Sequence, residues 1–103
     1  MTDDNPDRNA DYAQKLYDSE RDEVLDDIAK TLDKARGKHR VDIHSRHEGY
    51  AVVLEELDEV KECVWHDSNV IDLYREILHT AAMLVRMAVD LDLRAAAHDA
   101  EAL

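Results

Sequence analysis

Two glycines and one proline are the only strong helix-breaking residues in this chain of 103 residues. The backbone therefore has few places where a sharp turn or a helix break is built in. The remaining residues are rich in Ala, Leu, Glu, Asp and Arg and poor in aromatics, which also favours helices. An apolar content of 45% is too high for a wholly disordered chain. We therefore predict an all-α protein, and the length predicts a single domain.

The spacing of apolar residues predicts three long helices. The first covers about residues 10–36, and Gly37 follows it at the position of a left-handed C-terminal cap. Residues 1–9 are polar and acidic, so we expect a disordered tail there and a domain over residues 10–103.

The second helix is predicted to begin at Ser45, which has the spacing of a capping box with Glu48. The third is expected to follow a cap at Asp67 or Ser68 and to fade after Leu93. More than half of its circumference is apolar, so it should lie at the centre of an antiparallel helical bundle. Two other helices are too few to cover that face, and a homodimer would complete the core.

The charge of the chain is strongly acidic, with a formal net charge of -12. Such a chain repels the phosphates of nucleic acid, so no direct binding to nucleic acid is expected. A phosphate-bearing substrate remains compatible, because divalent cations can bridge carboxylates and phosphates.

The cellular compartment is predicted from three features. No apolar run reaches the roughly 18 residues that a membrane span needs, so we expect no membrane association. Cys63 is the only cysteine and cannot form an internal disulfide. Residues 1–9 do not resemble a signal peptide. We therefore expect a cytoplasmic protein.

Acidic side chains recur at one-turn spacing on the second and third predicted helices. Glu56 and Glu59 form one such pair, and Glu76 and His79 have the same spacing. The short connection between the two helices makes them antiparallel, which allows the pairs to face each other. Converging carboxylates resist ionisation unless a cation neutralises them. Because Mg²⁺ prefers oxygen ligands and shares them with substrate phosphates, the pattern suits metal-assisted hydrolysis of a nucleotide.

These residues also resemble a known family. Glu55, Glu56 and Glu59, followed after sixteen residues by Glu76 and His79, resemble the EExxE…ExxD motif of MazG-like nucleoside triphosphate pyrophosphohydrolases. The resemblance extends over about half of the chain, through HEGYAVVLEELDEV and REILHTAAMLVRMAVDL.

The resemblance implies an all-α bundle, often a homodimer or homotetramer, that cleaves NTP or dNTP to NMP and pyrophosphate with Mg²⁺. It implies that Glu56, Glu59 and Glu76 bind the metal. Glu55 would be a further carboxylate that orients or deprotonates the attacking water.

His79 departs from the motif, because the family has Asp at this position. Imidazole is a poor ligand for Mg²⁺ and a better one for Mn²⁺. His79 is therefore open to three interpretations: a ligand of Mn²⁺, a phosphate contact, or the mark of changed or lost activity. Asp72 is the only local substitute along the helix. His47, near a helix N-terminus, and Arg86, two turns beyond His79, are candidates for binding substrate phosphates.

Two other functions remain open from the sequence. The first is a non-catalytic relative that uses the same bundle for binding or assembly, which the histidine in the motif would explain. The second is an acidic helical protein that binds a basic partner. In either case, the glutamates of the second helix could form an ordinary solvated face.

Overall fold

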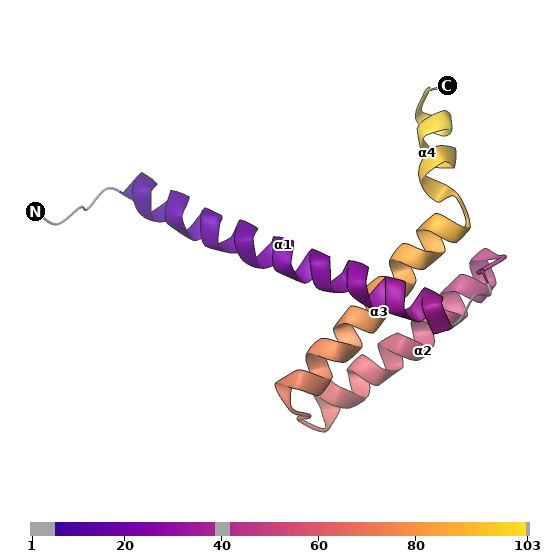
Figure 1. Cartoon of the computed structure of the whole chain (residues 1–103), viewed down its shortest axis with the longest axis horizontal. Helices are drawn as coiled ribbons and strands as arrows, with labels where there is room; N and C mark the ends of the chain where they lie inside the picture. Colours follow the sequence, from indigo (N-terminus) through magenta and orange to yellow (C-terminus); the bar gives the residue numbers. More distant parts are fainter. Residues whose placement is uncertain (1–5, 39–41, 103) are drawn as a thin grey trace, which may run out of the picture.

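The computed structural model describes residues 6–38 and 42–102, and all regular structure in these ranges is helical (Figure 1). The helices are α1 (Pro6–Lys38), α2 (Arg46–Trp65), α3 (Val70–Asp90) and α4 (Leu93–Ala102). The prediction of an all-α fold is confirmed. None of these helices is both long and apolar enough to cross a lipid bilayer.

Helix α1 is longer than predicted at both ends. It begins at Pro6, where the fixed φ of proline and its missing N–H suit the first helical turn. Residues 6–9 are thus helical, whereas the rest of the predicted tail, residues 1–5, lies outside the described residues. Gly37 lies within the helix without a positive φ, so the predicted left-handed cap is wrong. Basic residues in the last turn interact favourably with the negative end of the helix dipole.

Helix α2 begins as predicted. The Ser45 hydroxyl oxygen accepts a hydrogen bond from the backbone N–H of Glu48 at 3.1 Å. The Glu48 carboxylate accepts the backbone N–H of His44 at 3.2 Å, one residue before the position expected for a capping box.

Helix α3 begins and ends differently from the prediction. Its cap is Asn69, whose side-chain oxygen accepts the backbone N–H of Asp72 at 2.9 Å. Asp67, proposed as a cap, instead adopts a φ of 48° in the turn between α2 and α3. Asp92, with a φ of 53°, then separates α3 from α4. Helical structure therefore continues after Leu93 as α4, because the alanine-rich segment there is a good helix former.

Helices α2 and α3 form the predicted antiparallel hairpin (Figure 1). A Cβ atom on Gly49 would lie 2.7 Å from Cγ of Met87, so only glycine permits this approach of the two helices without a shift. Helix α1 packs across α3, where the Tyr74 hydroxyl donates a 2.6 Å hydrogen bond to Asp27. That hydrogen bond raises the pKa of Tyr74 to about 12, since it stabilises the protonated phenol.

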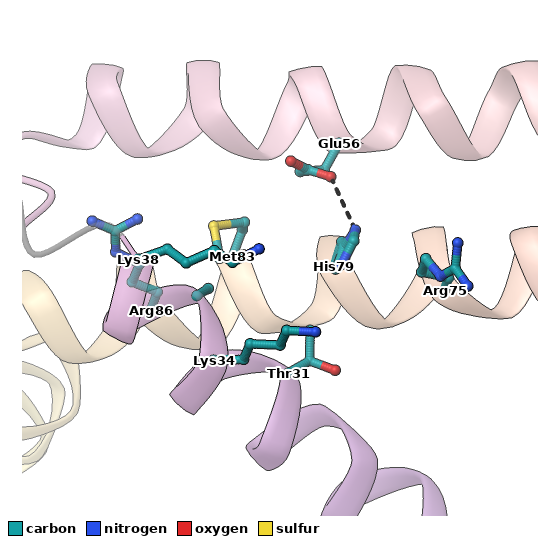
Figure 2. A pocket seen from close by; sticks show the side chains of 9 residues that line it. Thr31, Lys34, Lys38, Glu56, Arg75, His79, Met83 and Arg86 are labelled. Carbon is teal, nitrogen blue, oxygen red and sulfur yellow. Dashed lines mark ion pairs between the residues drawn. The ribbon is translucent and has the colours of Figure 1, made fainter.

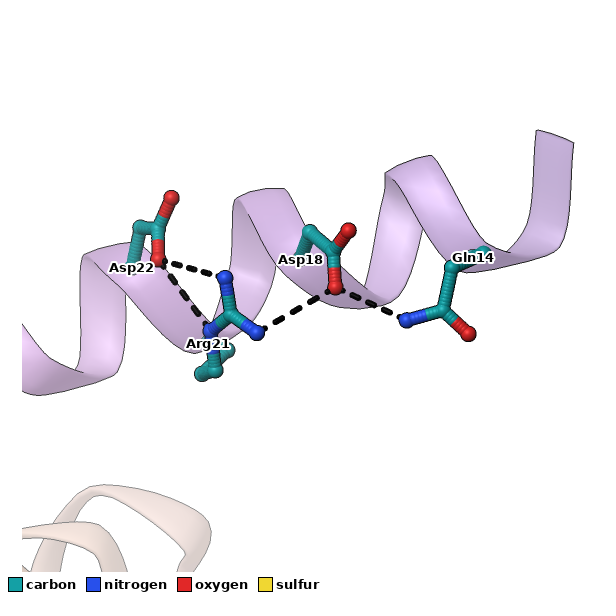
Figure 3. A network of polar contacts seen from close by, with 4 residues as sticks. All are labelled: Gln14, Asp18, Arg21 and Asp22. Atoms are coloured by element: carbon teal, nitrogen blue, oxygen red, sulfur yellow. Dashed lines mark hydrogen bonds and ion pairs between the residues drawn. The ribbon is translucent and has the colours of Figure 1, made fainter. Parts of the chain in front are cut away.

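The N-terminal part of α1 extends away from the hairpin and is supported by its own side chains (Figure 3). Gln14 donates a 2.9 Å hydrogen bond to Asp18, and the guanidinium of Arg21 lies 3.3 Å from the same carboxylate. Arg21 also donates to Asp22 at 3.1 Å. The two pairs with Asp18, at spacings of three and four residues, stabilise an isolated helix by about 0.2–0.5 kcal/mol each.

The apolar core is small. Among the described residues, Ile43, Ala82 and Met83 are the buried apolar side chains, whereas many large ones remain exposed on α1, α2 and α3. The radius of gyration is 18.4 Å, compared with about 13 Å for a compact domain of 100 residues. The chain therefore exposes much of the surface that would normally form its core.

Candidate functional site

Three of the predicted metal-ligand residues meet between α2 and α3. One potential ligand atom from each of Glu56, Glu76 and His79 lies within 4.8 Å of the other two. Nδ1 of His79 is 3.9 Å from Oε2 of Glu56 and 3.7 Å from Oε2 of Glu76. Figure 2 shows Glu56 of α2 facing His79 of α3 across the seam of the hairpin. We call Glu56, Glu76 and His79 the Glu–Glu–His cluster.

The carboxylates of this cluster lack donors. Oε2 of Glu56 and Oε2 of Glu76 are both buried and accept no hydrogen bond from any residue that the structure describes. The two side chains are 28% and 20% exposed. A buried acceptor that loses water without gaining a partner costs about 1–3 kcal/mol, and a charged one costs more. A bound cation would supply the missing partner for both oxygens.

The electrostatics of the cluster also disfavour its ionised form. Burial raises the pKa of Glu56, and repulsion from Glu59 raises it further. Burial likewise raises the pKa of Glu76, with hydrogen bonding to Glu59 and repulsion from it as additional causes. His79 opposes the rise in both cases. A hydrogen bond between two carboxyl groups requires a proton on one of them, so the fully ionised cluster lacks even that bond.

Glu59, Glu55 and Asp72 have different places around the cluster. Glu59 is exposed and outside the tight group of three, but it acts on both glutamates of the cluster. Glu55 is also exposed, and its effect on Glu56 is a weaker repulsion. Asp72 lies in the first turn of α3, where its backbone N–H donates to the Asn69 cap and its carboxylate lies 3.9 Å from Arg75, so the structure does not place it where the missing Asp of the motif would be.

A cavity of about 630 Å³ opens beside the cluster. This volume is typical of sites for small molecules. Its walls come from α1, α2 and α3 (Figure 2). The lining residues are Thr31, Lys34, Ala35, Lys38, Glu56, Arg75, His79, Met83 and Arg86.

The two predicted phosphate-binding residues differ in position. Arg86 lines the cavity, but its side chain is only 11% exposed and its Nε lies 3.3 Å from Oδ2 of Asp90. The same oxygen accepts the backbone N–H of Ile43 at 2.9 Å, so Arg86 belongs to a contact that fixes the start of the α2 segment to α3. His47 is exposed and does not line the cavity.

Sequence reasoning missed the contribution of α1. Thr31, Lys34 and Lys38 line the cavity from this helix, and Arg75 joins them from α3. The three α1 residues recur at spacings of three and four, which places them on one face of the helix. The sequence therefore held a signal for a shared face, but no local pattern indicated that this face lies over the hairpin.

No family model, curated protein or solved structure among those compared with the chain matches it. The resemblance to MazG-like enzymes thus stays a prediction from the motif.

Proposed function

We propose that the protein is a metal-dependent nucleoside triphosphate pyrophosphohydrolase that converts NTP or dNTP to NMP and pyrophosphate. One observation carries the proposal: the unpartnered, buried oxygens of Glu56 and Glu76 converge with His79 beside a cavity of substrate size. The spacing of these residues in the sequence also resembles the motif of enzymes with this activity.

The donor set fits a divalent cation. Glu56 and Glu76 would offer carboxylate oxygens, His79 an imidazole nitrogen, and Glu59 a further carboxylate from the adjoining turn. Mg²⁺ accepts the oxygens readily, whereas the nitrogen favours Mn²⁺. When bound, such a metal would polarise a phosphoryl oxygen and make a water molecule more acidic.

The residues of the chain would supply the base and the rigid support for the reaction. Attack of water on the α-phosphorus breaks the bond to the bridging oxygen, so pyrophosphate leaves and the water proton must pass to a base. A carboxylate near the cluster can take that proton, and Glu55 is our candidate because it is exposed and adjoins Glu56. The hairpin contributes rigidity, since sites on helices are held more precisely than sites on loops.

One observation favours a second function. His79 stands where the motif has Asp, and Glu55 lies outside the tight cluster. A non-catalytic protein of the same architecture, which binds a metal or a nucleotide without cleaving it, would tolerate both features. We keep this as the alternative.

Pyrophosphate release from a panel of NTPs and dNTPs, with Mg²⁺ and separately with Mn²⁺, tests the proposal. We expect release with at least one nucleotide, and a loss of release in Glu56→Gln. Glu62→Gln is the matched control, because Glu62 lies on the same helix in an exposed pair with His66. Absence of release with every nucleotide and both metals would contradict the hydrolase. Metal-induced thermal stabilisation without release would instead support the non-catalytic alternative.

We further propose that the protein acts as a homodimer, or as a homotetramer built from such dimers. The chain exposes 8478 Å², whereas a compact monomer of 11.8 kDa exposes about 5,900 Å². If the nine residues outside the described ranges were fully exposed, they would add about 160 Å² each. The remaining excess of about 1,100 Å² per chain exceeds the roughly 800 Å² that each partner buries in a standard interface.

The partner surface is the outer face of the hairpin. Leu54 and Leu57 on α2 and Ile77 and Leu84 on α3 are each at least 40% exposed. On α3, the apolar positions of this face recur at spacings of three and four from Val70 onwards without an acidic residue among them. The absence of carboxylates from the α3 part of this face favours the association of two copies with a net charge of -12.

Light scattering coupled to size-exclusion chromatography tests this pairing. We expect the mass of a dimer or tetramer for the protein, and a lower mass for Leu57→Glu or Leu84→Glu. Glu62→Gln again serves as the control. A monomer at micromolar concentration would contradict the pairing.

A cytoplasmic location is a further prediction, suggested by the single cysteine.

A further inference from the structure

We infer that Lys34 and Lys38 of α1, together with Arg75 of α3, form a subsite for the phosphate chain of a polyphosphate ligand beside the Glu–Glu–His cluster. The inference deepens the proposed function and rests on it for the choice of ligand. It assigns the binding of phosphates to residues that the motif does not contain.

The first observation is a local reversal of charge. The chain has 25 acidic residues and 13 lysines and arginines. Of the nine residues that line the cavity, however, four are lysine or arginine and one is acidic. A basic cavity in an acidic protein concentrates an anion where the rest of the surface repels it.

The second observation is that the two lysines are not used by the fold. Neither Lys34 nor Lys38 has an ion pair with any residue in ranges 6–38 and 42–102. By contrast, Lys30 on the same helix pairs with Asp26 at 2.8 Å. Arg75 has only a long contact of 3.9 Å to Asp72, in which both side chains are more than half exposed.

The third observation is that this placement of lysines works against the helix. Lys34 has no acidic residue three or four positions away in either direction, and two of those four neighbours are lysines, Lys30 and Lys38. Like charges at this spacing destabilise a helix. The helix dipole favours Lys38 in the last turn but does not remove this repulsion, and a bound anion between Lys34 and Lys38 would offset it.

The position of α1 keeps these lysines beside the cluster. The hydrogen bond from Tyr74 to Asp27 fixes α1 to α3, and Arg36 lies 3.8 Å from Asp42 beyond the end of the helix. Figure 2 shows that Lys34 and Lys38 come from α1, while Glu56 comes from α2 and His79 lies on α3. A phosphate chain in the cavity would thus meet cationic groups from α1 and the proposed metal site from the hairpin.

The lining also indicates what the cavity recognises. None of the nine lining residues is a Phe, Tyr or Trp that could stack on a base, or an Asn or Gln that could hydrogen-bond to its edge. The imidazole of His79 is assigned to the Glu–Glu–His cluster. Within the described residues, phosphates are therefore the part of a nucleotide that this cavity can select. We expect little discrimination among bases, and binding of inorganic tripolyphosphate, which has no nucleoside.

Calorimetric titration with inorganic tripolyphosphate, in the presence and absence of Mn²⁺, tests the subsite directly. We expect binding to the protein, and an affinity at least about tenfold weaker in the double variant Lys34→Gln/Lys38→Gln, since two charged hydrogen-bond donors are lost. Lys34→Arg/Lys38→Arg should retain most of the affinity, because the charge is kept. Lys30→Gln, one turn before Lys34, should bind like the unmodified protein.

Each outcome separates the subsite from the proposed activity. Binding that depends on Lys34 and Lys38 without any pyrophosphate release would support the subsite and contradict the hydrolase. Release whose KM is unchanged in the glutamine double variant would support the hydrolase and overturn the subsite. Absence of tripolyphosphate binding under both conditions would also overturn it. Thermal denaturation shows that the variants are folded, and we expect the metal-induced shift to persist in them.

Discussion

Helix α3 contributes to two charged clusters along its length, and they differ in one respect. Arg86 and Asp90 carry opposite charges 3.3 Å apart, and Asp90 also accepts a backbone N–H. The Glu–Glu–His cluster has two carboxylates, one imidazole at 3.7 and 3.9 Å, and two oxygens without donors. The first cluster is satisfied by the protein alone. In the second, no residue of the described ranges donates a hydrogen bond to the two buried carboxylate oxygens, as is expected where a ligand binds.

Disruption of the pair between Arg86 and Asp90 should have the largest effect on stability. Asp90→Ala should lower the free energy of unfolding by about 3–5 kcal/mol, because it removes the buried carboxylate 3.3 Å from the guanidinium of Arg86. It also removes the acceptor for Ile43. Urea denaturation of the metal-free protein measures the loss. Asp26→Ala is the control, since Asp26 and Lys30 form an exposed pair whose loss should cost much less. Equal losses in the two variants would show that Arg86 and Asp90 are not a buried, coupled pair.

The unsatisfied cluster should respond to metal. Mn²⁺ at about 100 times its dissociation constant should stabilise the protein by about 2.7 kcal/mol. Glu76→Gln should remove most of this gain, because it replaces a charged ligand with a neutral amide. Glu62→Gln, on the exposed face of α2, should keep it. Thermal denaturation with and without Mn²⁺ is the measurement, and an equal shift in Glu76→Gln would place the metal elsewhere.

The approach of α2 to α3 brings Glu56 next to Glu76, and Gly49 permits that approach. Gly49→Ala should cost about 1–3 kcal/mol, because the added Cβ overlaps the Met87 side chain. Gly37→Ala is an informative control: no atom lies within 4 Å of the added Cβ, and alanine is favoured in a helix by about 0.5–1 kcal/mol. Opposite signs for the two substitutions are expected in chemical denaturation. A neutral Gly49→Ala would mean that Met87 can move aside freely.

The sequence predicts the hairpin and its cluster well for a physical reason. Helical spacing fixes which residues share a face, and a short connection forces antiparallel packing, so Glu56 and Glu76 could be placed from local rules. The helix ends were less predictable. Several polar residues near a terminus can cap it. In α3 the cap is Asn69, and not Asp67 or Ser68 as predicted.

The position of α1 could not be predicted in the same way. Its contact with α3 includes the hydrogen bond between Asp27 and Tyr74, which no periodicity links. Lys34 and Lys38 were consequently missed as cavity residues. Arg86 was predicted as a phosphate ligand because it lies two helical turns beyond His79 in the sequence. Its contact with Asp90 has the four-residue spacing of a pair within one helix, whereas the contact of Asp90 with Ile43 depends on how the segment before α2 folds back.

The smallest expected effect is the pH dependence of stability. It shows whether the surroundings of the Glu–Glu–His cluster disfavour or favour the ionised carboxylates. The pKa of Glu56 and that of Glu76 are raised in the folded state, first by burial. Above the ordinary value of 4.5 the folded protein therefore binds more protons at these groups than the unfolded chain does. Linkage then requires their contribution to stability to be present at low pH and to be lost as pH rises through the raised values.

Glu76→Gln isolates this contribution, because the amide imitates the protonated carboxyl at every pH. Without metal, the variant should be at least as stable as the unmodified protein near neutral pH, and its advantage should shrink on acidification towards the ordinary carboxyl value of 4.5. Urea denaturation of both proteins in a chelator, with Glu62→Gln as the control, measures the difference. An advantage that grows on acidification would mean that protonated His79, 3.7 Å from Glu76, stabilises the carboxylate more than burial and Glu59 disfavour it. The cluster would then be satisfied by its own histidine, and the contrast with Arg86 and Asp90 would disappear.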